Sequence, residues 1–272
     1  MSLVCSGIGA AGRGKAVTAR LLVLCAAILF LLIGGEPARG TEVLVDQGHG
    51  QRFLMEGDRP LDLSGLATVF REQDATVRSS SEALSAKILA GTDVLILSGP
   101  FTALTLAEIA ATMDFLQQGG RLVIMAHIAQ PLGQLLEHLG VAISILPVSE
   151  QEHLLADQPR DFSVVDLASH PLLQGLTSFK MYGAWALLNK GETVQVLART
   201  STRAWLDLDQ NGSPDGRDPV RAFPLIVSGR AGKGTFVVFS DDALFQNRFL
   251  KGDNLQLAKN LAAWLCRMGV DI

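Results

Sequence analysis

The chain has very little cysteine. Two of its three cysteines, Cys5 and Cys25, fall in the first 25 residues, so Cys266 alone remains if that segment is removed. A lone cysteine cannot form an internal disulfide, a CxxC redox pair or a thiolate metal cluster. We therefore expect no redox cofactor and a fold held by its apolar core. Cys266 shares an apolar helical face with Leu261 and Trp264, which predicts a buried, inert thiol.

Aromatic residues and concentrated positive charge are also scarce. Aromatics make up 6% of the chain, which argues against a sugar-stacking groove. The formal net charge is −4 and no basic stripe is present, so neither nucleic acid nor an anionic membrane surface is an expected partner. No GxGxxG or Walker pattern surrounds Gly48 and Gly50, and ordinary turn glycines explain both positions; no nucleotide cofactor is expected.

One long apolar run is present, and it lies near the N-terminus. Residues 21–33 are almost entirely aliphatic, follow the basic residues Arg13, Lys15 and Arg20, and are too few for a comfortable membrane span. Small residues stand at −3 and −1 before Thr41. This pattern predicts a signal peptide over residues 1–40 and an exported protein, periplasmic or secreted. The alternative is an uncleaved N-terminal helix that anchors the chain to the membrane.

Cleavage before Thr41 would change the balance of charge. The leader carries four basic residues and one acid, so its loss moves the formal charge from −4 to −7. A lipoprotein is not predicted, because Leu22, Val23 and Leu24 rather than small residues precede Cys25. The remaining 41–272 segment is long enough for one large α/β domain with its own core.

Strands and helices alternate through most of this segment. The predicted strands are 42–46, 75–78, 93–98, 121–125 and 235–240, and the predicted helices are 61–73, 105–118 and 254–268. Thr105 and Glu108 have the spacing of a capping box. Such alternation predicts a doubly wound, mostly parallel sheet of the Rossmann-like or flavodoxin-like kind. Residues 141–230 are less regular and predict a β-rich elaboration within a single domain spanning 41–272.

Several segments resemble a class I glutamine-amidotransferase-like family of unknown function. They are residues 46–51, 93–100, 105–120 and the Gly232-Lys233-Gly234…Ser240-Asp241…Asn247…Asn254…Trp264-Leu265 series. The family is similar to the periplasmic domain of gliding-motility ABC-transporter auxiliary proteins and to the N-terminal domain of an intraflagellar-transport subunit. The resemblance implies the fold and an accessory role in transport.

The chain departs from true amidotransferases at the nucleophile. Those enzymes need an activated cysteine on the turn after a strand. Here the strand 121–125 continues into Ala126-His127-Ile128, without cysteine or serine. The resemblance therefore implies the scaffold without the activity.

Ligands of doubly wound sheets bind beyond the carboxyl ends of the strands. The polar residues expected there are Asp46, His49, Gln51, Ser98, His127, Ser240 and Asp241. One hypothesis is that they converge to bind a small ligand or a metal; the alternative is that they only satisfy loop amides and backbone carbonyls. Asn247 and Asn254 are explained as a loop residue and a helix N-cap.

A second candidate site lies at residues 207–218, which read D-x-D-x-N-G-x-x-D-x-x-D. The spacing would direct oxygens of Asp207, Asp209, Asn211, Ser213, Asp215 and Asp218 toward one Ca²⁺, with a structural role. Asp218 in place of the usual glutamate, Pro214 and the strand-like flanks weaken this hypothesis. A solvated turn is the alternative.

Two functions follow from these features. The leading hypothesis is an exported, non-catalytic binding module that serves an envelope transport or polymer-export assembly through a protein partner. The alternative is a periplasmic hydrolase that acts on a small carbohydrate or amide through Asp46, His49 and His127.

Overall fold

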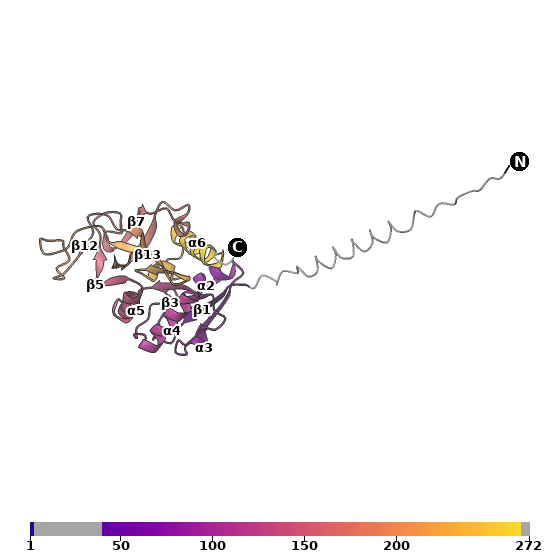
Figure 1. Ribbon diagram of the computed structural model, residues 1–272. Coiled ribbons are helices and arrows are strands. Elements are labelled where there is room, and N and C mark those ends of the chain that lie inside the picture. Colours follow the sequence, from indigo (N-terminus) through magenta and orange to yellow (C-terminus); the bar gives the residue numbers. More distant parts are fainter. Residues whose placement is uncertain (3–39, 268–272) are drawn as a thin grey trace. The chain divides into compact units, whose positions relative to one another are not determined.

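A mixed sheet of eight strands forms the centre of the computed structural model, which describes residues 1–2 and 40–267 (Figure 1). The spatial order is β2-β1-β3-β4-β14-β13-β11-β8. The first five strands run parallel, and the last three alternate in direction to form an antiparallel edge. The mostly parallel α/β fold is thus confirmed. The strands are β1 Glu42–Asp46, β2 Thr76–Ser80, β3 Val94–Ser98, β4 Arg121–Met125, β8 Asp166–Leu167, β11 Val194–Arg199, β13 Pro224–Ala231 and β14 Gly234–Phe239.

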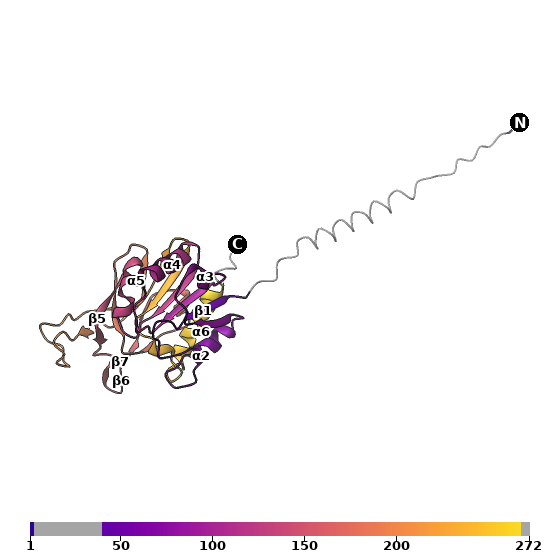
Figure 2. The same cartoon turned by 90° about the horizontal axis from the view of Figure 1, so that it is seen from below.

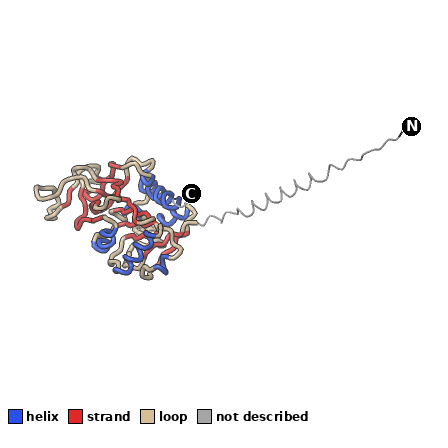
Figure 3. Tube along the Cα trace, in the orientation of Figure 1, coloured by secondary structure: helices blue, strands red, loops and turns tan. Residues whose placement is uncertain are grey.

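The irregular β-rich region forms the antiparallel edge of the central sheet, through β8, β11 and β13, and two small sheets. Their strand orders are β10-β5-β12 and β6-β7-β9. The strands are β5 Val141–Ser149, β6 Leu154–Leu155, β7 Gln158–Val164, β9 Phe179–Tyr182, β10 Trp185–Asn189 and β12 Trp205–Leu206. The long segment between β12 and β13 contains no helix (Figure 3).

Helices cover both faces of the central sheet (Figure 2). The helices are α2 Ser64–Arg71, α3 Ala86–Leu89, α4 Leu106–Gln117, α5 Gly133–His138 and α6 Asp253–Arg267, with 3₁₀ turns η1 Gln130–Leu132, η2 Pro171–Leu173 and η3 Ala243–Phe245. Alternate residues of each central strand enter different cores. Val43 and Val45 of β1 pack with α2 and α6, whereas Leu44 packs with α4 and α5. This arrangement explains why the strands are apolar on both faces.

The capping box of α4 is present as the sequence predicted. The Thr105 hydroxyl accepts the Glu108 N–H at 3.3 Å, and the Glu108 carboxylate accepts the Thr105 N–H at 2.8 Å. Helix α4 therefore begins at a fixed place just beyond the carboxyl end of β3.

Other boundaries differ from the sequence expectations. Helices α3 and α5 have only four and six residues, too few for a clear apolar period, and were not predicted. Asn254 is not an N-cap, because α6 already begins at Asp253. Its buried amide instead bonds the backbone of Lys180 in β9, accepting the N–H at 2.8 Å and donating to the carbonyl at 3.1 Å.

The contacts group Gly40–Ile272 into one compact unit. Most of the predicted leader, and the last residues of the predicted C-terminal helix, lie outside the described residues. Within the part that the structure describes, no helix combines the length and the apolar character needed to cross a bilayer.

Candidate functional site

The polar residues singled out at the strand ends lie along one edge of the sheet. Asp46 ends β1 opposite Leu97, and Ser98 ends β3 opposite Met125 of β4. His127 follows β4 by two residues, and Ser240 directly follows β14. Because these strands are parallel, their carboxyl ends share this edge, where the fold places ligand sites.

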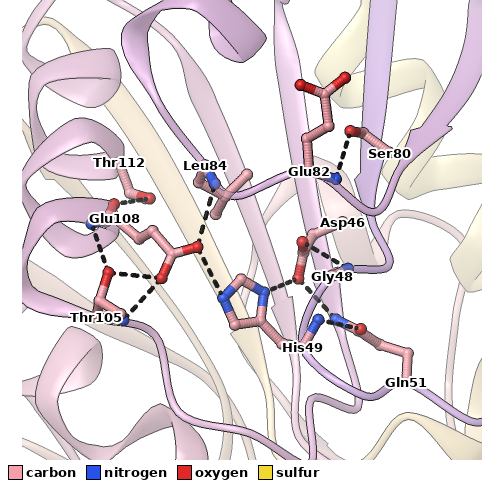
Figure 4. A network of polar contacts seen from close by, with 10 residues as sticks. All are labelled: Asp46, Gly48, His49, Gln51, Ser80, Glu82, Leu84, Thr105, Glu108 and Thr112. Carbon is pink, nitrogen blue, oxygen red and sulfur yellow. Dashed lines mark hydrogen bonds and ion pairs between the residues drawn. The ribbon is translucent and has the colours of Figure 1, made fainter.

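His49 is held between two buried carboxylates (Figure 4). Its Nδ1 lies 2.7 Å from Asp46 Oδ2, and its Nε2 lies 3.1 Å from Glu108 Oε1. The three residues are 1%, 3% and 6% exposed for Asp46, His49 and Glu108. Both ring nitrogens are therefore occupied away from solvent, and the Asp46–His49–Glu108 triad joins the loop after β1 to the start of α4.

Further hydrogen bonds fix the two carboxylates. Asp46 accepts the Gly48 N–H at 3.1 Å and the Gln51 side-chain amide at 2.6 Å, so Gln51 belongs to the same network. Glu108 accepts the Leu84 N–H at 3.2 Å and the Thr105 hydroxyl at 2.7 Å. These bonds tie three loops at the carboxyl edge together.

The electrostatics of the triad favour charged side chains. The hydrogen bond to Asp46 raises the pKa of His49, although burial opposes it. Burial pulls the pKa of Glu108 upward, but the bonds from Thr105 and His49 outweigh burial and lower it to about 2. Both shifts favour the ionised forms of His49 and Glu108 when the two side chains are in contact.

A second pair forms around His127. Its Nδ1 lies 3.0 Å from Asp242 Oδ1; the His127 side chain is 34% exposed, whereas that of Asp242 is fully buried. The hydrogen bond to Asp242 raises the pKa of His127 against the effect of burial. Burial raises the pKa of Asp242, and His127 works against that rise.

Two phenylalanines and an arginine surround the His127 ring. The Phe53 and Phe101 ring centroids lie 4.9 and 5.3 Å from it. The guanidinium carbon of Arg52 lies 4.6 Å from the Phe101 centroid. We call Arg52, Phe53, Phe101 and His127 the His127 corner. Its Phe101 N–H bonds the His49 carbonyl at 2.9 Å, which links the corner to the triad through backbone.

The remaining predicted residues are buried beside the corner. Ser98 and Ser240 are 3% and 0% exposed, and neither hydroxyl has a hydrogen-bond partner among the described residues. Asp241 accepts the Tyr182 N–H at 2.7 Å and the Ala243 N–H at 2.8 Å. Burial and the neighbouring Asp242 raise its pKa to about 8.

The structure thus brings the predicted residues to one edge, where some join two separate networks and Ser98, Ser240 and Asp241 bond to no side chain of either. Asp46, His49 and Gln51 form one network, and His127 belongs to the other. Sequence reasoning missed Glu108 as a partner of His49, because the capping box alone accounted for it. Asp242 was overlooked beside Asp241, although two acids directly after a buried strand were a usable signal.

The turn after β4 carries no nucleophile. Ala126 and His127 occupy it, and among the described residues no serine or cysteine side chain bonds a histidine. Cys266 lies near the C-terminal end of α6 and is partly rather than fully buried, in contrast to the prediction; this burial still raises the pKa of its thiol.

The acidic residues of the 207–218 loop partly cluster. Carboxylate oxygens of Asp207, Asp209 and Asp218 lie within 4.8 Å of one another. Asp207 accepts the Asn211 and Gly212 N–H groups at 3.0 and 2.9 Å, and Asp218 accepts those of Leu208 and Asp215.

The rest of the predicted calcium ligands are engaged elsewhere in that loop. Arg217 pairs with Asp209 and, at 2.7 Å, with Asp215. The Asn211 side chain accepts the Ser213 N–H at 2.8 Å. Three carboxylates could hold a hard cation, but Arg217 already neutralises part of their charge.

Solved structures share this fold. They include the mmIFT52 N-terminal domain, with a TM-score of 0.68, 16% identity and coverage of 85% of this chain and 100% of that one. Cytoplasmic protein STM1381 from Salmonella typhimurium LT2 has a TM-score of 0.55 and 15% identity, with coverage of 83% of this chain and 99% of that one. A ThuA-like protein from Parabacteroides merdae ATCC 43184 has a TM-score of 0.51 and 13% identity, with coverage of 85% of this chain and 91% of that one.

At such identities these likenesses establish the fold alone: a mixed, mostly parallel sheet covered by helices, as in the ThuA-like protein, with extra β elements. No curated protein matches the chain. A family model described as a domain of unknown function, DUF4350, matches residues 58–262. That match covers most of the sequence, and the chain belongs to the DUF4350 family.

Proposed function

We propose that the protein is an exported, non-catalytic binding module that serves an envelope transport or polymer-export assembly. Its binding end would be the carboxyl edge of β1, β3, β4 and β14. The observation that carries the proposal is the His127 corner, where a partly exposed imidazole is fixed by buried Asp242 beside two phenylalanine rings. Preorganised polar and aromatic groups of this kind suit recognition.

The geometry of the other polar groups supports binding over catalysis. Both nitrogens of His49 are committed to carboxylates, so that ring has no free position for substrate. The Ser98 and Ser240 hydroxyls form no hydrogen bond to a base among the described residues. The similarity to the periplasmic part of gliding-motility transporter auxiliaries gives the envelope role its motivation.

A second candidate is a hydrolase of small carbohydrates or amides. The observation that favours it is the His127–Asp242 pair, because a carboxylate-held imidazole with a solvent-facing edge is a suitable general base for water. Asp46 and His49 would then support the loop structurally. This candidate needs His127 for chemistry, whereas the binding module needs it only for contact.

A crosslinking experiment in cells tests the binding module. A photoreactive residue replaces Phe53 at the corner or, as the matched control, exposed Glu72 just after the C-terminal end of α2. We expect one defined adduct with an envelope protein from position 53 and none from position 72. Equal labelling, or no adduct from position 53 in a variant that complements a deletion strain, would contradict the proposal.

The hydrolase candidate has its own test. His127→Ala and His127→Gln are compared in complementation, with exposed His138→Ala as control. Glutamine keeps a hydrogen-bonding side chain but cannot act as a base. Full complementation by His127→Ala eliminates the hydrolase candidate, and rescue by His127→Gln alone favours contact over chemistry.

A further inference from the structure

We propose that the His127 corner is an anion-binding subsite that holds a carboxylate or phosphate group of a small ligand between Arg52 and His127. Phe53 and Phe101 would contact the apolar body that carries this group. The inference rests on the proposed binding function, because it assigns a ligand class to the same edge of the sheet.

Arg52 supplies an uncommitted positive charge. Its guanidinium carbon lies 4.6 Å from the Phe101 centroid, so the side chain is supported by the ring face while remaining exposed. Within residues 40–267, it forms no salt bridge with a carboxylate. Arg52 is also close enough to His127 that its charge lowers the pKa of the imidazole. A planar guanidinium with free N–H groups is well suited to binding oxyanions.

His127 supplies a directed donor beside the same Phe101 ring, with the two ring centroids 5.3 Å apart. Its Nδ1 is bonded to Asp242, which leaves the Nε2 edge of a side chain that is 34% exposed. The buried Asp242 carboxylate orients the ring and favours its charged form. When protonated, Nε2 donates to an anion; the two cations and one carboxylate then leave the corner with a net positive charge.

The buried layer below the corner has the character of a built site. Asp242 Oδ2, Ser98 Oγ and Ser240 Oγ are three of the four buried side-chain atoms without hydrogen-bond partners in the described part of the chain. Such atoms are costly to bury and are not explained by stability. Gly99 adopts a φ of +53°, and a Cβ there would lie 2.7 Å from Asp242 Oδ2 and 3.2 Å from the His127 Cβ. The loop therefore closes tightly on this pair.

The charges at the corner argue against a cation as its ligand. The groups whose charges act on His127 are Asp242, Asp241 and Arg52. Asp242 is shielded by His127, and Asp241 is committed to two backbone N–H groups. Arg52 is the exposed member, so an approaching ion first meets positive charge. An anion gains from this arrangement and a metal ion does not.

The test is an NMR titration of the purified full chain, in which the imidazole resonances are followed. The probes are benzoate, phenyl phosphate and neutral benzamide. Inorganic phosphate, which has no ring, shows how much of the binding comes from the anionic group alone. We expect benzoate or phenyl phosphate to shift the His127 signals saturably at pH about 6 and to raise the His127 pKa. Benzamide should not shift these signals, and binding of the two anions should weaken at pH about 9, where His127 loses its proton. The stronger of the two anions identifies the carboxylate or phosphate preference.

Arg52→Gln is the decisive variant, because the side chain is exposed and its loss should not unfold the protein. Arg221→Gln is the matched control: exposed Arg221 lies 5.2 Å from the Phe223 centroid, away from the corner. We expect R52Q to weaken anion binding roughly tenfold and R221Q to leave it unchanged.

Two results would overturn the inference. One is equal binding of benzamide and benzoate. That result would show that the edge binds ligands regardless of their charge, and it would leave the proposed binding function intact. The other is the absence of any His127 shift with all four probes. Failure of the crosslinking at position 53, with anion binding intact, would instead defeat the protein-partner function and leave the subsite standing.

Discussion

Buried ionisable side chains at the carboxyl edge fix the conformation of the loops there. His49 is 3% exposed, yet it contacts two carboxylates at 2.7 and 3.1 Å. Removing a charge from water is costly, and that cost is offset only when its partners and their remaining hydrogen bonds are all in place. Here Gly48, Gln51, Leu84 and Thr105 complete the set. The triad therefore fixes the loop after β1 in one position.

Replacing His49 tests this role. We expect His49→Ala to lower the free energy of unfolding by roughly 3–5 kcal/mol, because it leaves two buried carboxylates without their shared cation. Urea unfolding measures the change. The control is His138→Ala, which removes an exposed histidine at the end of α5 and should cost less than about 0.5 kcal/mol. Equal effects of the two substitutions would show that the triad is not a structural clamp.

The pKa directions give the triad a defined pH window. Glu108 has its pKa lowered from 4.5 to about 2, so it stabilises the fold above pH about 4.5 and loses this effect as pH falls toward 2. The lowering corresponds to a contribution on the order of 3 kcal/mol. His49 has its pKa raised, so its contribution is complete below pH about 6.5 and is lost as pH rises through the raised value.

Urea midpoints of the wild type and Glu108→Gln should therefore differ most between about pH 5 and 6.5. The difference should shrink on both the acidic and the alkaline side. The measurement is a series of unfolding curves from pH about 2 to 9. Parallel curves for the two proteins across that range would refute the assignment of charge to Glu108 and His49.

At the scale of elements, the central strands could be predicted from the sequence, but the short helices and the pairing of distant strands could not. Apolar runs such as 94–97 are typical of strands buried on both faces, and the Thr105–Glu108 spacing located the start of α4. Helices α3 and α5 are too short to show a period, and the small sheets depend on pairings between distant segments. The same limit applies to the site: Glu108 is 59 residues from His49, and only the folded sheet brings them together.

The 207–218 loop allows a prediction about Ca²⁺. Saturating Ca²⁺ at about 100 times its dissociation constant should add roughly 2.7 kcal/mol of stability, a rise in melting temperature of several degrees for a domain of this size. Asp207→Ala/Asp209→Ala should abolish the rise, and chelator should reverse it. Thermal unfolding with and without Ca²⁺ measures both.

Arg217 offers a sharper variant of the same experiment. It pairs with Asp209 and Asp215 and would compete with a cation for these carboxylates. Arg217→Gln should therefore strengthen the response to Ca²⁺. If neither the wild type nor this variant responds, the loop is a solvated turn held by its own amide hydrogen bonds.

At the scale of the molecule, the binding module and the anion-binding subsite are both proposed at the same edge of the sheet. The parallel strands β1, β3, β4 and β14 end side by side, and their helices return on both faces. The loops that follow these strands carry Asp46, His49 and the His127 corner. A binding module would therefore use this edge whatever its partner, as open α/β sheets generally do.

Export concerns the whole chain and depends on residues 1–40. The basic residues, the apolar run 21–33 and the small residues before Thr41 predict cleavage between Gly40 and Thr41. Intact mass spectrometry of the protein recovered from its native envelope fraction should give a chain beginning at Thr41. Thr41 directly precedes β1, so the cut would leave the sheet intact. Replacing Ala38 and Gly40 with arginine should block the cut and retain the protein at the membrane. A native species that begins before Leu21 would refute cleavage and support the uncleaved anchor.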